Sequence, residues 1–406
     1  MAVVSIVGMG LGLSDLGRRH LDIIAKADIL VAGQRHLALF PDHPAEKKAI
    51  TPPIDALISD IRRFMNEKKV VVLASGDPLF YGIGKTLAER LGDDYVEVVP
   101  HVSVMAEAFA RIKRPWADAA VISLHGREAD MGLPAALSRK NPIFLFTDHR
   151  HTPAHVARIV SEMAPGRWQI GVFERLGEPD EKISWAPAAD AMDSSFKEPN
   201  AVILWPDIAA FDPLPLRLGA PDESYQHERG LITKSEVRAV TIAKLRLGPD
   251  HILWDLGAGS GSVAIEAAIF LTRGRSVAVE KHPGRAGHIR ENIKRFNVGQ
   301  VSVRELTLPQ GMTELPDPDR VFMGGGGKDF EAILGSACGR LCAGGRIVVN
   351  LVVIETAAKC MRILQELGFI TDLVQIQVGK GAQMSMGTRI SGTNPVFIIS
   401  AEKPEI

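Results

Sequence analysis

The chain has 406 residues, of which 46% are hydrophobic and 23% charged, and its formal net charge is −1 at pH 7. This length exceeds what one hydrophobic core supports, so we expect two or three domains. The near-neutral charge argues against a general polyanion binder, and the composition predicts a globular protein without a membrane span or signal peptide. Three cysteines are too few for a disulfide framework, which favours a reducing cytoplasm.

The first half of the chain alternates buried strands with helical segments, a pattern that predicts parallel strands covered by helices. Its first strand runs into Gly8 and Gly10, and a later strand runs into the turn Gly76-Asp77-Pro78. Glycines at such turns let the backbone bend sharply and approach a ligand. In chain order we predict a strand within 3–12, helix 18–27, strands 28–33 and 70–75, a helix near 84, strand 96–100, helix 103–111, strands 119–126 and 142–147, helix 153–163, and strands 168–176 and 200–205.

The periodic pattern lapses between Pro206 and Pro221, where Pro213, Pro215 and Gly219 interrupt the chain. Segments of this composition are typical of domain boundaries. We therefore expect one domain over residues 1–206, a linker over 207–227 and a second domain over 228–406, and we expect the two domains to be separable.

The second half begins with a helix, for which Thr233 and Glu236 predict a capping box and Gly248 the end. Its last two strands, 369–378 and 394–403, are joined by a Gly- and Ser-rich segment without room for a helix, so we expect them to pair antiparallel. Between these ends we predict strand 252–255, a helix from 262, strand 276–280, helix 284–297, strands 301–306 and 319–323, a helix to 341, strand 345–354 and helix 355–367.

The clearest functional signal follows the strand at 252–255. Gly257, Gly259 and Gly261 form a turn there, and Glu280 ends the next strand, nineteen residues beyond Gly261. An acidic residue at about that distance lies beside the first turn and can accept both hydroxyls of a ribose. Strand, glycines, helix, second strand and terminal acid in this order predict a nucleoside-type cofactor.

Asp255, just before the glycine turn, helps to identify that cofactor. A carboxylate there suits a ligand with positive charge, such as the sulfonium and ammonium of S-adenosylmethionine (SAM). It would be unfavourable beside a pyrophosphate, which prefers helix-terminal N–H groups. The alternative is an ordinary turn or capping aspartate. A mostly parallel sheet with an antiparallel end also favours a SAM-dependent methyltransferase over a dehydrogenase.

Motifs in each half resemble a known methyltransferase family. IVGMGLG, SGDPLFYGIG and SLHGRE in the first half are similar to the tetrapyrrole methylases. HERGLITKSEVRA, WDLGAGSGSVAIEAA, AVE and NPV in the second half are similar to class I methyltransferases of corrin biosynthesis. The resemblance covers nearly the whole chain. It implies an α/β protein with an N-terminal tetrapyrrole methylase fold of two α/β subdomains and a C-terminal Rossmann-like class I fold.

The resemblance also implies an activity. Enzymes with this fusion add two methyl groups to meso carbons of a corrin precursor and remove carbon dioxide from an acetate side chain. The first half is expected to methylate position 5, and the second half to methylate position 15 and decarboxylate. An electron-rich macrocycle can attack the sulfonium methyl itself, so we expect no activated protein nucleophile and assign no catalytic residue, including the proton donor for decarboxylation.

The family motifs carry site residues onto both halves. In the second half we expect SAM contacts from Thr233, Asp255, Gly257, Gly259, Gly261 and Glu280. In the first half we expect a cofactor cleft formed by Gly8, Gly10, Gly76, Asp77, Pro78, Ser103, His125 and Gly126. Two of these have plain structural alternatives, because Thr233 can be only a helix cap and Asp77 only a turn residue.

Three basic residues, Arg229, Lys234 and Arg238, are candidates for binding carboxylates of a polyanionic macrocycle, with a solvated basic helix face as the alternative. One departure from the family concerns Leu306 and Leu308, which stand where smaller residues usually border the adenine and which could narrow that pocket. We expect no metal, because the histidines near Asp148 lack a further acidic or thiolate ligand in pattern.

Three rival functions stay open on the residues alone: a nicotinamide-dependent oxidoreductase, an RNA methyltransferase and a non-catalytic SAM sensor. The RNA class is disfavoured because no Asn/Asp-Pro-Pro-aromatic motif follows the fourth strand, where Gly324 to Gly327 stand instead. We expect a small tetrapyrrole substrate, no nucleic acid, no membrane partner and a homo-oligomer.

Overall fold

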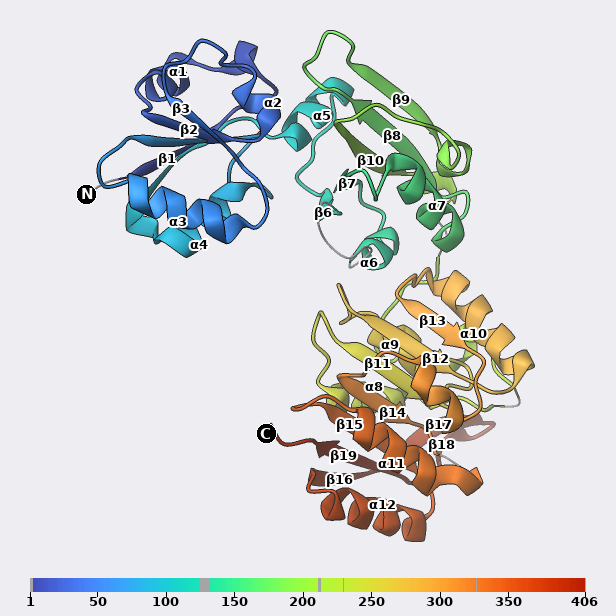
Figure 1. The fold of residues 1–406 in the computed structure, drawn as a ribbon. Coiled ribbons are helices and arrows are strands. Elements are labelled where there is room, and N and C mark those ends of the chain that lie inside the picture. The colour runs from blue at the N-terminus through green and yellow to red at the C-terminus, as the bar shows by residue number, and fades with distance from the viewer. Residues whose placement is uncertain (1–2, 125–131, 211–212, 229, 326, 406) are drawn as a thin grey trace. The chain divides into compact units, whose positions relative to one another are not determined.

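The computed structural model describes residues 3–124, 132–210, 213–228, 230–325 and 327–405 (Figure 1). The chain divides into two compact units. Unit 1 comprises residues 1–127, 141–161 and 168–206, and unit 2 comprises residues 128–140, 162–167 and 207–406. Among the described residues, no helix is long and apolar enough to cross a membrane.

The first sheet of unit 1 is entirely parallel, in the order β3-β2-β4-β1-β5. Its strands are β1 (Val4–Gly8), β2 (Ile29–Ala32), β3 (Glu46–Ala49), β4 (Val70–Ala74) and β5 (Val96–Val99). The helices are α1 (Arg18–Ala25), α2 (Gln34–Leu37), α3 (Ile54–Phe64), α4 (Ile83–Leu91) and, leading to the second sheet, α5 (Val104–Ile112) (Figure 1). The central strands are mostly apolar because each contributes to two cores: Ile6 packs into one cluster and Val7 into the other.

The second sheet of unit 1 has the order β6-β7-β10-β8-β9. Its strands are β6 (Ala120–Ser123), β7 (Ile143–Phe146), β8 (Trp168–Glu174), β9 (Lys182–Pro187) and β10 (Asn200–Pro206), with helix α7 (Pro153–Met163) between β7 and β8. Only β6 and β7 pair parallel, and the other neighbours are antiparallel. The expectation of parallel layers is therefore wrong for this sheet, because β8, β9 and β10 follow one another without the α-helical crossover that parallel neighbours need.

Unit 2 contains a seven-stranded sheet in the order β13-β12-β11-β14-β15-β19-β16. The strands are β11 (Ile252–Leu256), β12 (Arg275–Val279), β13 (Val301–Arg304), β14 (Arg320–Met323), β15 (Arg346–Leu351), β16 (Ile370–Ile376) and β19 (Val396–Glu402). The helices are α6 (Leu133–Leu137), α8 (Ser235–Leu245), α9 (Ser262–Ala267), α10 (Pro283–Phe296), α11 (Phe330–Arg340) and α12 (Ile354–Glu366). The first five strands in this order are parallel, whereas β16 and β19 pair antiparallel, which confirms the sequence prediction.

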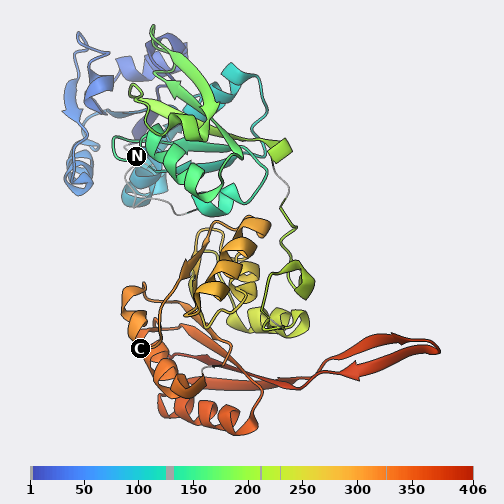
Figure 2. The same ribbon diagram turned by 90° about the vertical axis from the view of Figure 1, so that its right-hand side faces the viewer.

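The Gly- and Ser-rich segment before β19 forms a feature that the sequence did not suggest. It folds into a hairpin of β17 (Gly379–Met384) and β18 (Gly387–Gly392), which extends away from the sheet of unit 2 (Figure 2). Lys380 in this hairpin pairs with Glu236 at 3.0 Å. Glu236 is therefore not engaged in the predicted capping box, and α8 begins without a side-chain cap.

Part of the expected linker packs onto unit 2. Leu214 and Leu216 contact a buried cluster that includes Ala220 and Tyr225. The backbone N–H of Leu214 also donates to the carbonyl oxygen of Arg295 at 2.8 Å. From Leu214 to Tyr225 these residues thus contribute to the core of unit 2 instead of forming a free connection.

Candidate functional site

The glycine turn of unit 2 lies at the carboxyl end of β11. Gly257, Gly259 and Gly261 have φ angles of 75°, 58° and 73°, a region that residues with a side chain rarely adopt. Gly257 and Ala258 donate their backbone N–H groups to the carbonyl oxygen of Val279, which fixes the turn against the end of β12. The glycine pattern therefore has a conformational cause that the sequence alone could indicate.

Glu280 lies against this turn, as the sequence predicted for its position. One carboxylate oxygen accepts from the N–H of Gly259 at 3.0 Å, and the other accepts from the N–H of His282 at 3.0 Å. Only 4% of the residue is exposed. A carboxylate held this way keeps further lone pairs on both oxygens, so binding of ribose hydroxyls by Glu280 stays a prediction that its position allows.

Asp255 is the most strongly perturbed acid at this turn. The carboxyl group is buried, its Oδ2 accepts from the N–H of Ala264 at 3.1 Å, and its Oδ1 has no partner among the described residues. Burial raises the pKa of Asp255 to about 7; the bond from Ala264 opposes this rise, and the charge of Glu280 adds to it. A buried carboxyl with an unpaired oxygen is a place where a positively charged ligand would be stabilised.

This perturbation predicts a pH dependence of stability. Because the folded-state pKa lies above the usual value of 3.8, the folded protein holds the extra proton between pH 3.8 and about 7, and its stability falls as pH rises through that range. Asp255→Asn should remove this slope, which is at most about 1.4 kcal/mol per pH unit. Urea unfolding at several pH values measures it. Asp329→Asn, at an exposed aspartate, should leave the slope in place, and an unchanged slope in Asp255→Asn would contradict the assignment.

Two of the predicted basic residues of unit 2, Lys234 and Arg238, share the Asp222 carboxylate but differ in their surroundings. Arg238 is completely buried, and its guanidinium donates to Glu266 at 2.8 Å and to the carbonyl oxygen of Thr233 at 2.5 Å. This placement does not fit the prediction that Arg238 binds substrate carboxylates, nor the alternative of a solvated face, because its donors are used inside the fold. Lys234 is partly exposed and pairs with Asp222 at 3.3 Å.

Three other predictions for unit 2 have different outcomes. Arg229 lies outside the described residues. Thr233 lies before α8 but does not cap it with its side chain. Leu306 and Leu308 are partly buried, and they pack against the main core cluster of unit 2.

In unit 1 the predicted glycines meet at one edge of the first sheet. Gly10 and Gly76 form an isolated bridge between the turns after β1 and β4. A Cβ atom at Gly8 would lie 2.7 Å from the carbonyl oxygen of Gly76, and one at Gly10 would lie 2.6 Å from Nδ1 of His101. Neither position has room for a side chain, because Gly8 packs against the Gly76 turn and Gly10 against the His101 side chain.

The other predicted residues of unit 1 have visible structural roles. The Asp77 carboxylate accepts from the N–H of Leu79 at 2.8 Å, as a turn residue does, and Ser103 caps α5 through the N–H of Ala106 at 3.2 Å. Pro78 lies close to Gly82, where a Cβ atom would be 2.5 Å from its carbonyl oxygen. His125 and Gly126 lie outside the described residues.

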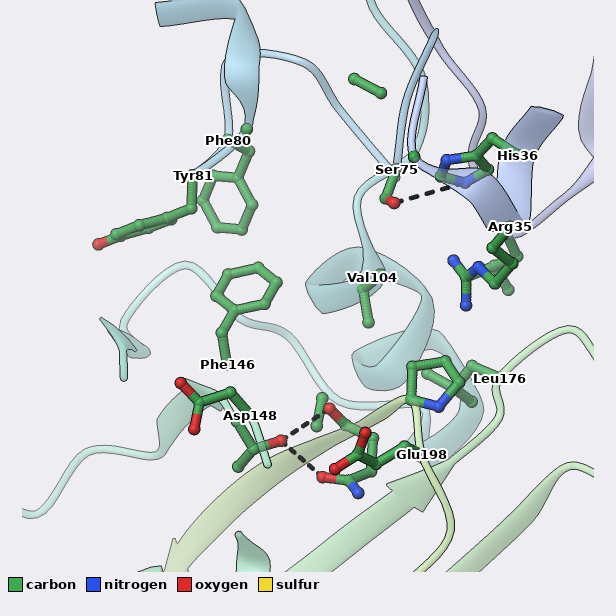
Figure 3. Close-up of a pocket in the computed structure, with 18 of the residues that line it drawn as sticks. Arg35, His36, Ser75, Phe80, Tyr81, Val104, Phe146, Asp148, Leu176 and Glu198 are labelled. Carbon is green, nitrogen blue, oxygen red and sulfur yellow. Dashed lines mark hydrogen bonds between the residues drawn. The ribbon is translucent and has the colours of Figure 1, made fainter. Parts of the chain in front are cut away.

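A cavity of about 590 Å³ lies in unit 1 and is lined by residues of both sheets (Figure 3). Of the predicted residues that the structure describes in this unit, only Gly10 lines it. Phe80, Tyr81 and Phe146 form an aromatic wall, with ring centroids 5.4 to 5.7 Å apart. The size is typical of a small-molecule site, and the wall offers flat apolar surface to a conjugated ring.

The polar groups of this cavity were missed by sequence reasoning. Arg35 and His36 come from the segment after β2, on the opposite side from Asp148 and Glu198 (Figure 3). His36 lies 3.4 Å from the Ser75 hydroxyl, and burial, assisted by the charge of Arg35, lowers its pKa to about 4. The imidazole is therefore neutral near pH 7. The only feature of the sequence that could have pointed to Arg35 and His36 is their position after a predicted strand. The carboxyl end of that strand lies at the same edge of the sheet as the glycine turns.

Similar proteins were found for the whole chain. A family model for tetrapyrrole (corrin/porphyrin) methylases matches residues 3–191, and a model for a precorrin methyltransferase domain matches residues 223–403. Precorrin-6Y C(5,15)-methyltransferase [decarboxylating] from Sinorhizobium sp is 31% identical over 97% of this chain and 94% of its own length. A probable cobalt-precorrin-6B C(15)-methyltransferase (decarboxylating) from Sulfurisphaera tokodaii is 32% identical over 46% of this chain and 98% of its own. The crystal structure of precorrin-6y C5,15-methyltransferase from Geobacter metallireducens GS-15 is 41% identical, covers 46% of this chain and 97% of that chain, and has a TM-score of 0.44.

The α/β units with their glycine turns and the two matching family models define a methyltransferase with a tetrapyrrole methylase fold and a class I methyltransferase fold. The similarity along nearly the full length is more specific. The chain belongs to the family of decarboxylating precorrin-6Y C(5,15)-methyltransferases.

Proposed function

We propose that this protein transfers two methyl groups to precorrin-6B, at positions 5 and 15, and removes carbon dioxide from an acetate side chain during cobalamin biosynthesis. The observation that carries this proposal is the match to a decarboxylating C(5,15) relative over 97% of the chain. Unit 1 would methylate position 5, and unit 2 would methylate position 15 and decarboxylate.

SAM is the methyl donor that fits both units. In unit 2 the fit rests on the unpaired Oδ1 of Asp255, which a sulfonium or ammonium would neutralise, and on the open backbone at Gly257, where a Cβ atom would meet nothing within 4 Å. In unit 1 it rests on the paired turns of Gly10 and Gly76 beside the cavity. When bound, SAM supplies an electrophilic methyl group.

The residues of the protein then have limited tasks. Glu280 and the N–H groups of the glycine turn would orient the nucleoside, and Asp255 would hold the positive charge of the donor. In unit 1 the aromatic wall of Phe80 and Phe146 would exclude water from the reacting carbon and align the macrocycle. His36 lies 3.4 Å from the Ser75 hydroxyl, and its lowered pKa of about 4 makes it a polar but uncharged group of the cavity.

Two SAM equivalents should bind per chain. Calorimetric titration should give two sites, and Glu280→Ala should weaken one of them by about 1.5–3 kcal/mol, the scale of hydrogen bonds to a charged group. Glu291→Ala, at an exposed glutamate on α10, is the matched control and should leave both sites unchanged. A stoichiometry of one in the wild type, or full affinity in Glu280→Ala, would contradict these assignments.

The direct test is the product formed from precorrin-6B and SAM. Mass spectrometry should show the gain of two methyl groups and the loss of carbon dioxide, and carbon-13 label from SAM should appear at positions 5 and 15. Stabilisation by NADH instead of SAM would favour an oxidoreductase, and steep salt-dependent binding of RNA would favour an RNA methyltransferase. SAM binding without turnover would favour a sensor. A cytoplasmic location and a homo-oligomeric state stay predictions of the sequence.

A further inference from the structure

We propose that Arg35 binds a carboxylate of the tetrapyrrole in the cavity of unit 1 and thereby orients the macrocycle for methylation at position 5. This inference rests on the proposed function. It assigns a substrate-positioning role to a residue that neither the motifs nor the glycine turns indicated.

The charges of the cavity single out Arg35. It is the only lysine or arginine among the described residues that line the cavity, and His36 beside it is neutral near pH 7. No hydrogen bond or ion pair ties the Arg35 guanidinium to another part of the chain that the structure describes. An arginine in a cavity with its donors uncommitted is suited to bidentate binding of a carboxylate that enters with a ligand.

The strand order decides which ligand brings that carboxylate, because both SAM and the tetrapyrrole carry one. The turns with Gly10, Gly76 and Ser103 follow β1, β4 and β5, which are neighbours in the order β3-β2-β4-β1-β5. Arg35 follows β2, on the far side of β4 from β1. The carboxyl ends of these parallel strands share one edge, so Arg35 lies beside the Gly76 turn but furthest from the turns of Gly10 and Ser103, on the side where the methyl acceptor remains to be placed.

The opposite wall supports the same orientation. Asp148 and Glu198 lie across the cavity from Arg35 (Figure 3). An anionic side chain of the macrocycle would be repelled from that wall and attracted to Arg35. The aromatic wall of Phe80, Tyr81 and Phe146 lies on the far side of Val104 from Arg35 and can hold the conjugated ring (Figure 3).

The experiment uses the full chain and measures methylation at position 5 separately from release of carbon dioxide. In Arg35→Gln the KM for precorrin-6B at position 5 should rise by about tenfold to a hundredfold, the range for a lost charged hydrogen bond. The KM for SAM and the release of carbon dioxide should stay unchanged, because Arg35 touches neither. Arg35→Lys should recover part of the loss, since it keeps the charge without the bidentate fork. Arg114→Gln, at an exposed arginine of unit 1 outside the cavity lining, is the matched control.

Each outcome has a distinct meaning. An unchanged KM for precorrin-6B in Arg35→Gln would overturn the inference while leaving the proposed function intact. A rise in the KM for SAM alone would also overturn it, because the carboxylate would then belong to SAM. Absence of methylation at position 5 in the wild type would reject the proposed function for unit 1, and the inference with it.

Discussion

Replacing Glu266 by alanine should destabilise unit 2 by about 3–5 kcal/mol, the cost of removing one member of a buried ion pair. Glu266 and Arg238 are both fully buried, and their side chains meet at 2.8 Å. The same carboxylate accepts from the N–H groups of Gly219 and Ala220, at 2.8 and 3.0 Å, and from the Tyr225 hydroxyl at 3.0 Å. Burial raises the pKa of Tyr225, so its hydroxyl remains a donor. Alanine would leave all of these donors unpaired at once.

Urea unfolding of the full chain, followed in the transition of unit 2, measures this effect. Glu291→Ala removes an exposed carboxylate that pairs with Lys294 at 3.0 Å, and it should change stability far less because exposed ion pairs contribute little. The loss of stability in Glu266→Gln should lie between the losses in Glu266→Ala and Glu291→Ala, since glutamine keeps an acceptor oxygen but loses the charge. Equal stabilities for Glu266→Ala and Glu291→Ala would mean that the buried network does not hold this unit together.

A C-terminal piece that begins at Asp207 should release carbon dioxide from precorrin-6B, whereas one that begins at Pro221 should not fold stably. The shorter piece lacks Leu214, Leu216 and Ala220, which pack into the core of unit 2. It also removes two backbone donors from the Glu266 carboxylate. The combined loss is on the order of 5 kcal/mol, comparable to the whole stability of many domains.

Circular dichroism and carbon dioxide release test both pieces side by side. The expectation from composition alone was a linker over residues 207–227, and the packing of Leu214 and Leu216 places a workable cut ahead of Leu214. A stable, active piece from Pro221 would show that the packed segment is dispensable. A folded but inactive piece from Asp207 would show that decarboxylation needs residues of the first half.

The sequence predicted the central strands because their residues are apolar on both faces and end in glycines. It missed β3 and β9, which lie at sheet edges and expose much of their length. Such strands carry polar residues like those of Glu46–Ala49, and no apolar run marks them. The antiparallel pairing in the second sheet was also missed, since it depends on which strands follow one another without a helix.

The residues of the candidate sites also fall into those that the sequence predicted and those that it missed. Gly257 and Gly10 were found because a left-handed backbone or a close approach of two turns selects glycine, and that leaves a pattern in the sequence. Arg35 and Phe146 were missed because a cavity wall selects only a side chain that reaches it. No fixed spacing connects residues on two different sheets. Arg238 was misassigned because the sequence around a helical arginine does not show whether its partner is a ligand or a buried glutamate.

The position of β19 has a consequence for how the protein is made on the ribosome. This strand lies between β15 and β16, although it follows both in the chain. Until residues 396–402 emerge, β15 and β16 have no partner between them, and apolar residues such as Val349 lack their cross-strand neighbour. Unit 1 ends at Pro206 and can complete both of its sheets much earlier in translation. The sheet of unit 2 therefore stays incomplete for longer during translation than the two sheets of unit 1.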